Sequence, residues 1–172
     1  MADKPPVVWC PADESNYTAA NRWAGGIEKI VIHVTQGAWS SAINWFKTPE
    51  SEASAHYVIR SEDGKIAQCV SDLNIAWHAG NWPVNQVSIG IEHEGFIDDA
   101  KWFTDQMFDS SARLAAYLCI CYGIPIDRQY IIGHDEVPGC PGEGGGADCH
   151  TDPGQWWWWD HYMTLVRQYA RG

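Results

Sequence analysis

Hydrophobic positions along the chain alternate between strand and helix periodicity. Apolar runs rich in β-branched residues, continuous or alternating with polar ones, predict strands. These strands are expected over 27–35, 56–60, 65–70, 87–95 and 129–133. Apolar residues at helical spacing predict helices over 41–47, 105–122 and 155–169. The order β-α-β-β-β-α-β-α favours an α/β fold in which helices flank a central mixed β-sheet.

Turn and capping residues place several boundaries. Gly64, at the end of SEDG between two predicted strands, indicates a β-hairpin. Thr104 is the expected N-cap of the long helix, and Gly123 is expected to end it. The inward stripe of this helix is expected to comprise Met107, Ser111, Leu114, Leu118 and Cys121. In the last helix, Trp159 is expected to pack inward.

Length and charge limit the class of protein. The chain has 172 residues, which suits one hydrophobic core, so we expect a single domain over 1–172 with 1–26 as an extension packed on it. The net charge of −11 argues against binding to a phosphate backbone. No apolar run approaches the roughly 18–20 residues that a membrane helix needs. We therefore expect no nucleic-acid partner and no membrane insertion.

Six cysteines raise the question of metal or disulfide chemistry. No CxxC pair occurs, so a zinc ribbon is not indicated. Cys140 and Cys149 bracket a glycine-rich segment, and a disulfide between them would restrict its freedom. Cys119 and Cys121 are two apart on a predicted helix and should point to different faces. The cysteine content favours an oxidising exterior over the cytosol.

Two histidines lie in or directly after apolar strands. Burying His33 within IVIHV costs free energy unless its ring nitrogens have partners. It is therefore either a hydrogen-bonded core residue, which the position alone favours, or a metal ligand held by a rigid strand. His134 follows another apolar strand where a loop begins, and such positions often carry reactive groups. The pair strengthens the metal-ligand interpretation.

A metal site needs a third donor, for which the sequence offers two candidates. Asp152 precedes Pro153, which favours an extended backbone, and His150 projects from the same side two residues earlier. Two histidines and Asp152 would leave one tetrahedral position for water, as in catalytic zinc sites. Cys140 is the alternative donor; we favour Asp152 because Cys140 has Cys149 as a disulfide partner. An aspartate before Pro-Gly is also a common turn residue.

Several short motifs in a fixed order resemble a known family. They are IVIHVT, SAHYVI, AWHAG, SIGIEHEG, IIGHDEVPG and HTDPG. In this order they closely resemble the zinc-dependent N-acetylmuramoyl-L-alanine amidases of the amidase-2 type, a family that includes phage amidase-lysozymes and peptidoglycan recognition proteins. The resemblance extends from about Ile27 to beyond Trp159. It implies a central mixed sheet with helices on its faces and a zinc ion at the floor of an open groove.

The resemblance also assigns roles to individual residues. It implies that His33, His134 and Asp152 bind one zinc ion per chain, and that Glu92 is the catalytic glutamate. His150 takes the position of the family's basic residue, which is often lysine. A titratable ring there would make activity more sensitive to pH.

Other positions follow from the same motifs. Trp77 and His78 correspond to a wall of the substrate groove. Some members have a tyrosine where this chain has Ala55, which gives more weight to the catalytic glutamate. Glu94 shares a strand face with Glu92, and only the resemblance distinguishes them. The glycine-rich segment between Cys140 and Cys149 is interpreted as an inserted loop. Three further histidines are expected to be structural or exposed: His56, His93 and His161.

The implied reaction is hydrolysis of the amide between the lactyl group of N-acetylmuramic acid and L-alanine of the stem peptide. Two alternatives are a non-catalytic peptidoglycan-recognition module and a zinc-free structural protein whose histidines are core residues. The expected partner is peptidoglycan or a muropeptide, and the expected state is a monomer. Within this family the expected roles are a secreted cell-wall enzyme, a phage endolysin or a cytosolic wall-recycling enzyme, and the cysteine content makes the cytosolic role the least expected.

Overall fold

The computed structural model describes residues 3–139 and 150–172. Its strands are β1 (Val7–Trp9), β2 (Tyr17–Thr18), β3 (Lys29–Val34), β4 (Tyr57–Ile59), β5 (Ile66–Gln68), β6 (Ile75–Ala76), β7 (Ser88–His93) and β8 (Ile131–Gly133). Its α-helices are α1 (Trp39–Phe46), α2 (Trp82–Val87), α3 (Asp105–Tyr122) and α4 (Trp159–Arg171). Short 3-10 turns cover Glu14–Asn16, Ala24–Gly26, Pro49–Ser51, Ala100–Trp102 and His134–Glu136.

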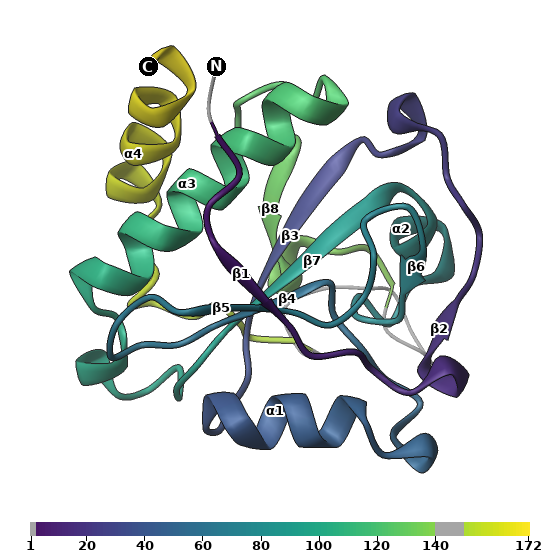
Figure 1. The fold of residues 1–172 in the computed structure, drawn as a ribbon. Coiled ribbons are helices and arrows are strands. Elements are labelled where there is room, and N and C mark those ends of the chain that lie inside the picture. Colours follow the sequence, from purple (N-terminus) through teal and green to yellow (C-terminus); the bar gives the residue numbers. More distant parts are fainter. Residues whose placement is uncertain (1–2, 140–149) are drawn as a thin grey trace.

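A mixed six-stranded sheet in the order β1-β5-β4-β7-β3-β8 forms the centre of the molecule (Figure 1). The β4–β5 pair is the predicted antiparallel hairpin, and Gly64 in its turn has a φ of +70°. The other neighbours in this sheet run parallel. The predicted α/β class with a central mixed sheet is confirmed.

Alternating side chains on the central strands supply two separate cores. Ile30 and Ile32 of β3 belong to a cluster with Leu114 of α3 and Val166 of α4, so α3 and α4 cover one face. On the other face, Val58 packs with residues of α1, and Val31 packs near α2. Figure 1 shows α3 and α4 side by side, with α1 on the opposite side of the sheet. His33 and Glu92 lie on the face of Val31, away from α3.

The start of the chain is joined to the sheet. Strand β1 pairs in parallel with β5 and forms an edge of the sheet. The buried side chain of Arg22 donates hydrogen bonds to the carbonyl oxygens of Gln86 at 3.0 Å, Ser88 at 2.9 Å and Asp72 at 2.6 Å. These contacts tie the described part of the N-terminal extension to β7 and its neighbours.

Some predicted details are wrong. Cys121 is exposed, whereas Cys119 is buried, because the inward stripe of α3 turns towards Cys119 in the last helical turn. The last helix begins at Trp159 rather than at residue 155, since Gly154 adopts a φ of +78° and Trp157 bonds back to its carbonyl. Trp157 is the fully buried tryptophan of this segment, while Trp159 is partly buried and packs against the core as expected.

Several short elements were missed. They are β1, β2, β6 and α2, and each is six residues or shorter. Such segments have too few residues for a periodic pattern to emerge.

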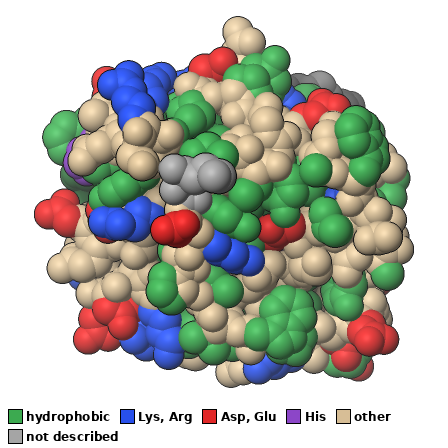
Figure 2. Space-filling model, turned by 45° about the horizontal axis from the view of Figure 1, so that its top comes forward, with side chains coloured by type: hydrophobic (Ala, Val, Ile, Leu, Met, Phe, Trp, Pro, Cys, Tyr) green, Lys and Arg blue, Asp and Glu red, His purple; other side chains and the backbone are tan. Residues whose placement is uncertain are grey.

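None of the described helices combines the length and apolarity needed to cross a membrane. On the face shown in Figure 2, acidic, basic and hydrophobic side chains are intermingled.

Candidate active site

The register of the parallel strands brings three candidate site residues to one place. His33 of β3 lies directly opposite Glu92 of β7, and parallel neighbours are about 4.8 Å apart. On the other side of β3, Ile32 lies opposite Gly133 of β8, so His134 follows beside His33. All three positions are at the carboxyl ends of parallel strands, where α/β sheets commonly bind ligands.

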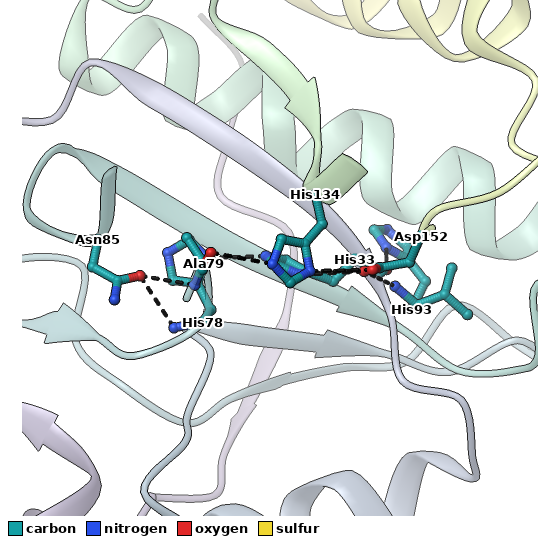
Figure 3. A network of polar contacts seen from close by, with 8 residues as sticks. His33, His78, Ala79, Asn85, His93, His134 and Asp152 are labelled. Atoms are coloured by element: carbon teal, nitrogen blue, oxygen red, sulfur yellow. Dashed lines mark hydrogen bonds and ion pairs between the residues drawn. The ribbon is translucent and has the colours of Figure 1, made fainter. Parts of the chain in front are cut away.

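His33, His134 and Asp152 form a cluster that could hold a metal ion. One ligand atom from each lies within 4.8 Å of the others. Nδ1 of His33 is 3.4 Å from Oδ2 of Asp152, and Nδ1 of His134 is 3.1 Å from Oδ1 (Figure 3). The backbone of Asp152 is fixed because its carbonyl accepts a hydrogen bond from the Asp135 amide at 2.9 Å. The sequence-predicted ligand set therefore converges in space.

The electrostatics of this cluster suit a cation. Burial lowers the pKa of His33 to about 4, although Asp152 opposes the shift, so its ring is neutral at neutral pH. Burial alone would raise the pKa of Asp152, but its contacts with the rings of His134 and His33 outweigh burial and hold this pKa well below its usual range. Two imidazoles and a carboxylate are the donors of many catalytic zinc sites.

The outward ring nitrogens of both histidines contact the segment 77–80. Nε2 of His33 is 2.9 Å from Nδ1 of His78, and Nε2 of His134 is 3.2 Å from the carbonyl oxygen of Ala79. A carbonyl oxygen only accepts, so Nε2 of His134 carries a proton, which leaves its Nδ1 directed at Asp152. Figure 3 shows this row of contacts running from Asn85 to Asp152.

His150 lies beside the cluster. Its ring stacks on that of His134 with centroids 3.6 Å apart and an angle of 18° between the planes. Burial and the neighbouring His134 lower the pKa of His150 from its ordinary value. His150 is thus close enough to contact a group bound at the cluster, and its neutral form is favoured at neutral pH.

Glu92 and Glu94 differ sharply in their surroundings. Both oxygens of Glu94 are occupied, because Oε1 accepts from the Trp39 amide and Oε2 from the Ser61 amide, each at 2.9 Å. Oε2 of Glu92 is enclosed and has no hydrogen-bond partner among the described residues. Burial and the negative charge of Asp152 raise the pKa of Glu92 to about 8. An unpaired carboxyl group whose pKa lies near neutrality, beside a metal-type cluster, is poised for proton transfer.

Two hollows adjoin the site. One, of about 460 Å³, is lined by Glu92 together with Thr35, Gly37 and Trp45. The other, of about 420 Å³, is lined by Trp77, Gly80, Trp82 and Asn85. A Cβ at Gly80 would lie 3.3 Å from Nε2 of His150, so the second hollow reaches the cluster.

The two predicted groove-wall residues occupy different environments. Trp77 lines the second hollow, and its Nε1 donates to Oγ1 of Thr18 at 3.0 Å. The ring of His78 instead lies behind His33 and against Gly90, where a Cβ would come within 2.4 Å of it. This position favours support of His33 over contact with substrate.

The remaining predicted residues are two histidines expected to be structural and the cysteines. His93 and His56 are buried and hydrogen-bonded, as expected for structural histidines. Cys140 and Cys149 lie outside the described residues. The four cysteines within them are free: Cys10, Cys69, Cys119 and Cys121.

Sequence reasoning missed Asn85. It is buried on α2 and bonds the backbone of the segment that contacts both histidines. The only sequence signal for Asn85 is that it lies three residues before the strand that carries Glu92, and this spacing matches no metal-site motif.

Comparison with known proteins points to one family. Residues 23–155 match the family described as N-acetylmuramoyl-L-alanine amidase. A relative from Achromobacter lyticus, named N-acetylmuramoyl-L-alanine amidase A, is 34% identical over 169 residues, which cover 93% of each chain. The 1,6-anhydro-N-acetylmuramyl-L-alanine amidase AmpD of Haemophilus influenzae is 30% identical over 124 residues, covering 69% of this chain and 61% of the relative.

Solved structures share the fold. The hydrolase AmiA of Staphylococcus aureus, solved with its ligand, has a TM-score of 0.73 at 18% identity, covering 98% of this chain and 84% of that chain. The endolysin amidase LysCS of Clostridium intestinale has a TM-score of 0.67 at 20% identity, covering 97% and 99%. The family match over residues 23–155 and the relative that is 34% identical show that the chain belongs to the N-acetylmuramoyl-L-alanine amidase family.

Proposed function

We propose that this protein is a zinc hydrolase that cleaves the amide between the lactyl group of N-acetylmuramic acid and L-alanine of the peptidoglycan stem peptide. The observation that carries the proposal is the convergence of His33, His134 and Asp152 next to the unpaired carboxylate of Glu92. Membership of the amidase family supplies the bond type and the substrate class.

The donor set fits a zinc ion. His33 and His134 would bind through Nδ1, and Asp152 through a carboxylate oxygen, because these atoms face one another. Three protein ligands leave a coordination position open for chemistry. When bound, zinc lowers the pKa of a water ligand to about 7 and polarises the scissile carbonyl.

The residues around the cluster divide the remaining work. Glu92 is the proposed base that accepts the proton of the attacking water through its free Oε2 and later passes it to the amine of L-alanine. His150, whose ring stacks on that of His134, is the proposed hydrogen-bond donor to the oxygen of the tetrahedral intermediate. Because the pKa of His150 is lowered, its contribution is that of a neutral N–H donor rather than of a full positive charge.

Substrate is proposed to occupy the two hollows that adjoin this site. Exposed Trp45 borders the hollow of Glu92, and exposed Trp82 borders the one beside His150. Aromatic side chains suit the apolar faces of sugar rings and the alanine methyl groups. The net charge of −11 disfavours unspecific attraction to anionic wall polymers, so recognition depends on these local contacts. We further propose that the protein acts outside the cytosol, as a secreted enzyme or an endolysin. It is proposed to act as a monomer.

Digestion of purified peptidoglycan followed by mass spectrometry tests the proposal. We expect stem peptides with a free L-alanine amine, together with glycan strands whose lactyl groups are free acids. Glu92→Gln should slow this release by about 10²–10⁴-fold while the variant still binds zinc. Binding to peptidoglycan without any release of peptides would instead identify a recognition module, and release of glycan fragments would assign a different bond.

A further inference from the structure

The segment Trp77–Gly80 connects both histidine ligands to one buried side chain. Oδ1 of Asn85 accepts hydrogen bonds from the backbone amides of His78 at 3.2 Å and Ala79 at 2.8 Å. Asn85 is 6% exposed and lies on α2. Its backbone N–H donates to the carbonyl oxygen of the N-cap residue Asn81 at 2.9 Å, which fixes its position. One side chain therefore sets the position of two consecutive residues in this segment (Figure 3).

Those two residues each contact one ligand. His78 presents Nδ1 to Nε2 of His33 at 2.9 Å, and the carbonyl oxygen of Ala79 faces Nε2 of His134 at 3.2 Å. The opposite nitrogen of each ligand ring faces Asp152. A rotation of either ring to satisfy a different partner would turn its Nδ1 away from Asp152.

The direction of the hydrogen bonds can be followed from a backbone carbonyl. Oγ of Ser88 lies 2.7 Å from the carbonyl oxygen of Val84, which accepts the single hydroxyl proton. Oγ of Ser88 must then accept from Nε2 of His78, 3.1 Å away. A neutral His78 is left with an unprotonated Nδ1, which accepts the Nε2 proton of His33. Nδ1 of His33 consequently keeps its lone pair for a metal.

Gly90 gives this arrangement its space. A Cβ at position 90 would lie 2.4 Å from Cγ of His78 and within 2.7 Å of two further ring atoms. Glycine in the middle of a buried strand is otherwise unfavourable, so close approach of the His78 ring accounts for it here.

We propose that Asn85 is a positioning residue that fixes both histidine ligands in the Nε2-protonated form, His33 through His78 and His134 through Ala79. The inference deepens the proposed function, because a ligand histidine held in this form presents Nδ1 to the metal without reorganisation. Partners of this kind commonly alter metal affinity by about 10–100-fold.

Asn85→Ser removes the acceptor at the required reach, whereas Asn85→Asp keeps it. We expect zinc affinity, measured by competition with a chelating dye, to fall about 10–100-fold in Asn85→Ser and to stay within a few-fold of the wild type in Asn85→Asp. Gly90→Ala, which displaces the His78 ring, should also weaken zinc binding. The matched control is Asn16→Ser, which removes another buried asparagine that donates to the carbonyls of Phe46 and Thr48. This control should bind zinc like the wild type even if it is less stable.

Nitrogen-15 NMR of the histidine rings supplies a readout that a loss of stability would not produce. In the metal-free wild type, Nε2 of both His33 and His134 should carry a proton, and Asn85→Ser should make both rings exchange between forms. The inference is overturned if either wild-type ring is found with Nε2 unprotonated, or if folded Asn85→Ser binds zinc as tightly as the wild type. If Asn85→Ser does not fold, the wild-type ring forms and the Asn85→Asp affinity decide. A protein with these ring forms that releases no stem peptide would refute the proposed function and leave this inference intact.

Discussion

His33 and His93 are buried histidines on neighbouring strands, yet their rings meet very different partners. His93 has both nitrogens occupied, with Nδ1 2.8 Å from the carbonyl oxygen of His33 and Nε2 2.7 Å from Oγ of Ser111. His33 has only Nε2 paired with a neutral group, and its Nδ1 faces the carboxylate of Asp152. The chain completes the hydrogen bonding of one histidine and leaves the other open for a cation.

The same contrast separates two glutamates, Glu92 in β7 and Glu94 directly after it. Glu94 bonds two backbone amides, whereas Oε2 of Glu92 is enclosed without a partner among the described residues. Burial of a polar group is costly unless it is satisfied, so an open group marks a place where the fold sacrifices stability for chemistry. Burial alone does not distinguish these residues; their unused bonding capacity does.

The largest difference in zinc binding and activity is expected between a variant of a histidine with an open ring nitrogen and a variant of a histidine whose nitrogens are both hydrogen-bonded. His134→Ala removes a ligand, and we expect zinc binding to collapse and peptide release to fall by roughly 10³-fold or more, since a metal supplies several kcal/mol to the transition state. His93→Gln should retain zinc and most activity, with a loss of about 1–3 kcal/mol in the free energy of unfolding. Zinc analysis, turnover and chemical denaturation measure these effects. Equal zinc loss in both variants would refute the comparison.

The glutamate pair should differ in turnover. Glu92→Gln is expected to lower kcat by about 10²–10⁴-fold, the usual contribution of a general base, with zinc still bound. Glu94→Gln leaves one backbone amide poorly paired, so it should lose about 1–3 kcal/mol of stability while kcat stays near the wild-type value. Parallel kinetics and unfolding curves separate the two. A normal kcat in Glu92→Gln would exclude it as the base.

His150 should have a smaller effect. His150→Ala removes the proposed donor to the tetrahedral intermediate, for which we expect a loss of about 10–100-fold in kcat with little change in KM, below the full value of a buried donor because the ring is partly exposed. His161→Ala, a histidine remote from the cluster, serves as the control. A rise in KM with unchanged kcat would indicate that His150 binds substrate instead.

Stability against pH gives the smallest effect. The pKa of Glu92 is about 8 in the folded metal-free protein against an ordinary 4.5, so the folded state retains a proton that the unfolded state loses between these pH values. The free energy of unfolding therefore receives a falling contribution from Glu92 as pH rises through this window. Metal-free Glu92→Gln should gain Tm relative to the wild type between pH 5 and 8, by a few degrees, since 1 kcal/mol corresponds to roughly 2–4 °C. A constant Tm difference across this range would show that the carboxyl is not perturbed.

Much of the fold follows from local patterns in the sequence. The strand containing His33 and the strand containing Glu92 have long apolar or alternating runs, and Thr104 and Gly123 bound the long helix as expected. The short edge strands and α2 have no such signal, because pairing with distant segments forms them. Periodicity also does not resolve which residue of the last helical turn faces inward, as Cys121 shows.

The candidate ligands could be proposed from the sequence because they occur in ordered motifs at strand ends. Their mutual distances could not, because they depend on the register between β3, β7 and β8. The distinction between Glu92 and Glu94 and the place of His78 behind His33 depend on contacts between residues far apart in the chain. Asn85 is invisible to motif reasoning for the same reason, since it acts through the backbone of another segment.

The open Nδ1 atoms of His33 and His134 and the carboxylate of Asp152 are proposed to form one zinc site. Metal analysis of chelator-treated protein reloaded with zinc, combined with zinc X-ray absorption, tests it most directly. We expect one zinc ion per chain with two imidazole nitrogens and a carboxylate oxygen among its ligands, at distances of about 2.0–2.2 Å. A chain that takes up no zinc, or zinc uptake that survives unchanged in His134→Ala, would contradict it.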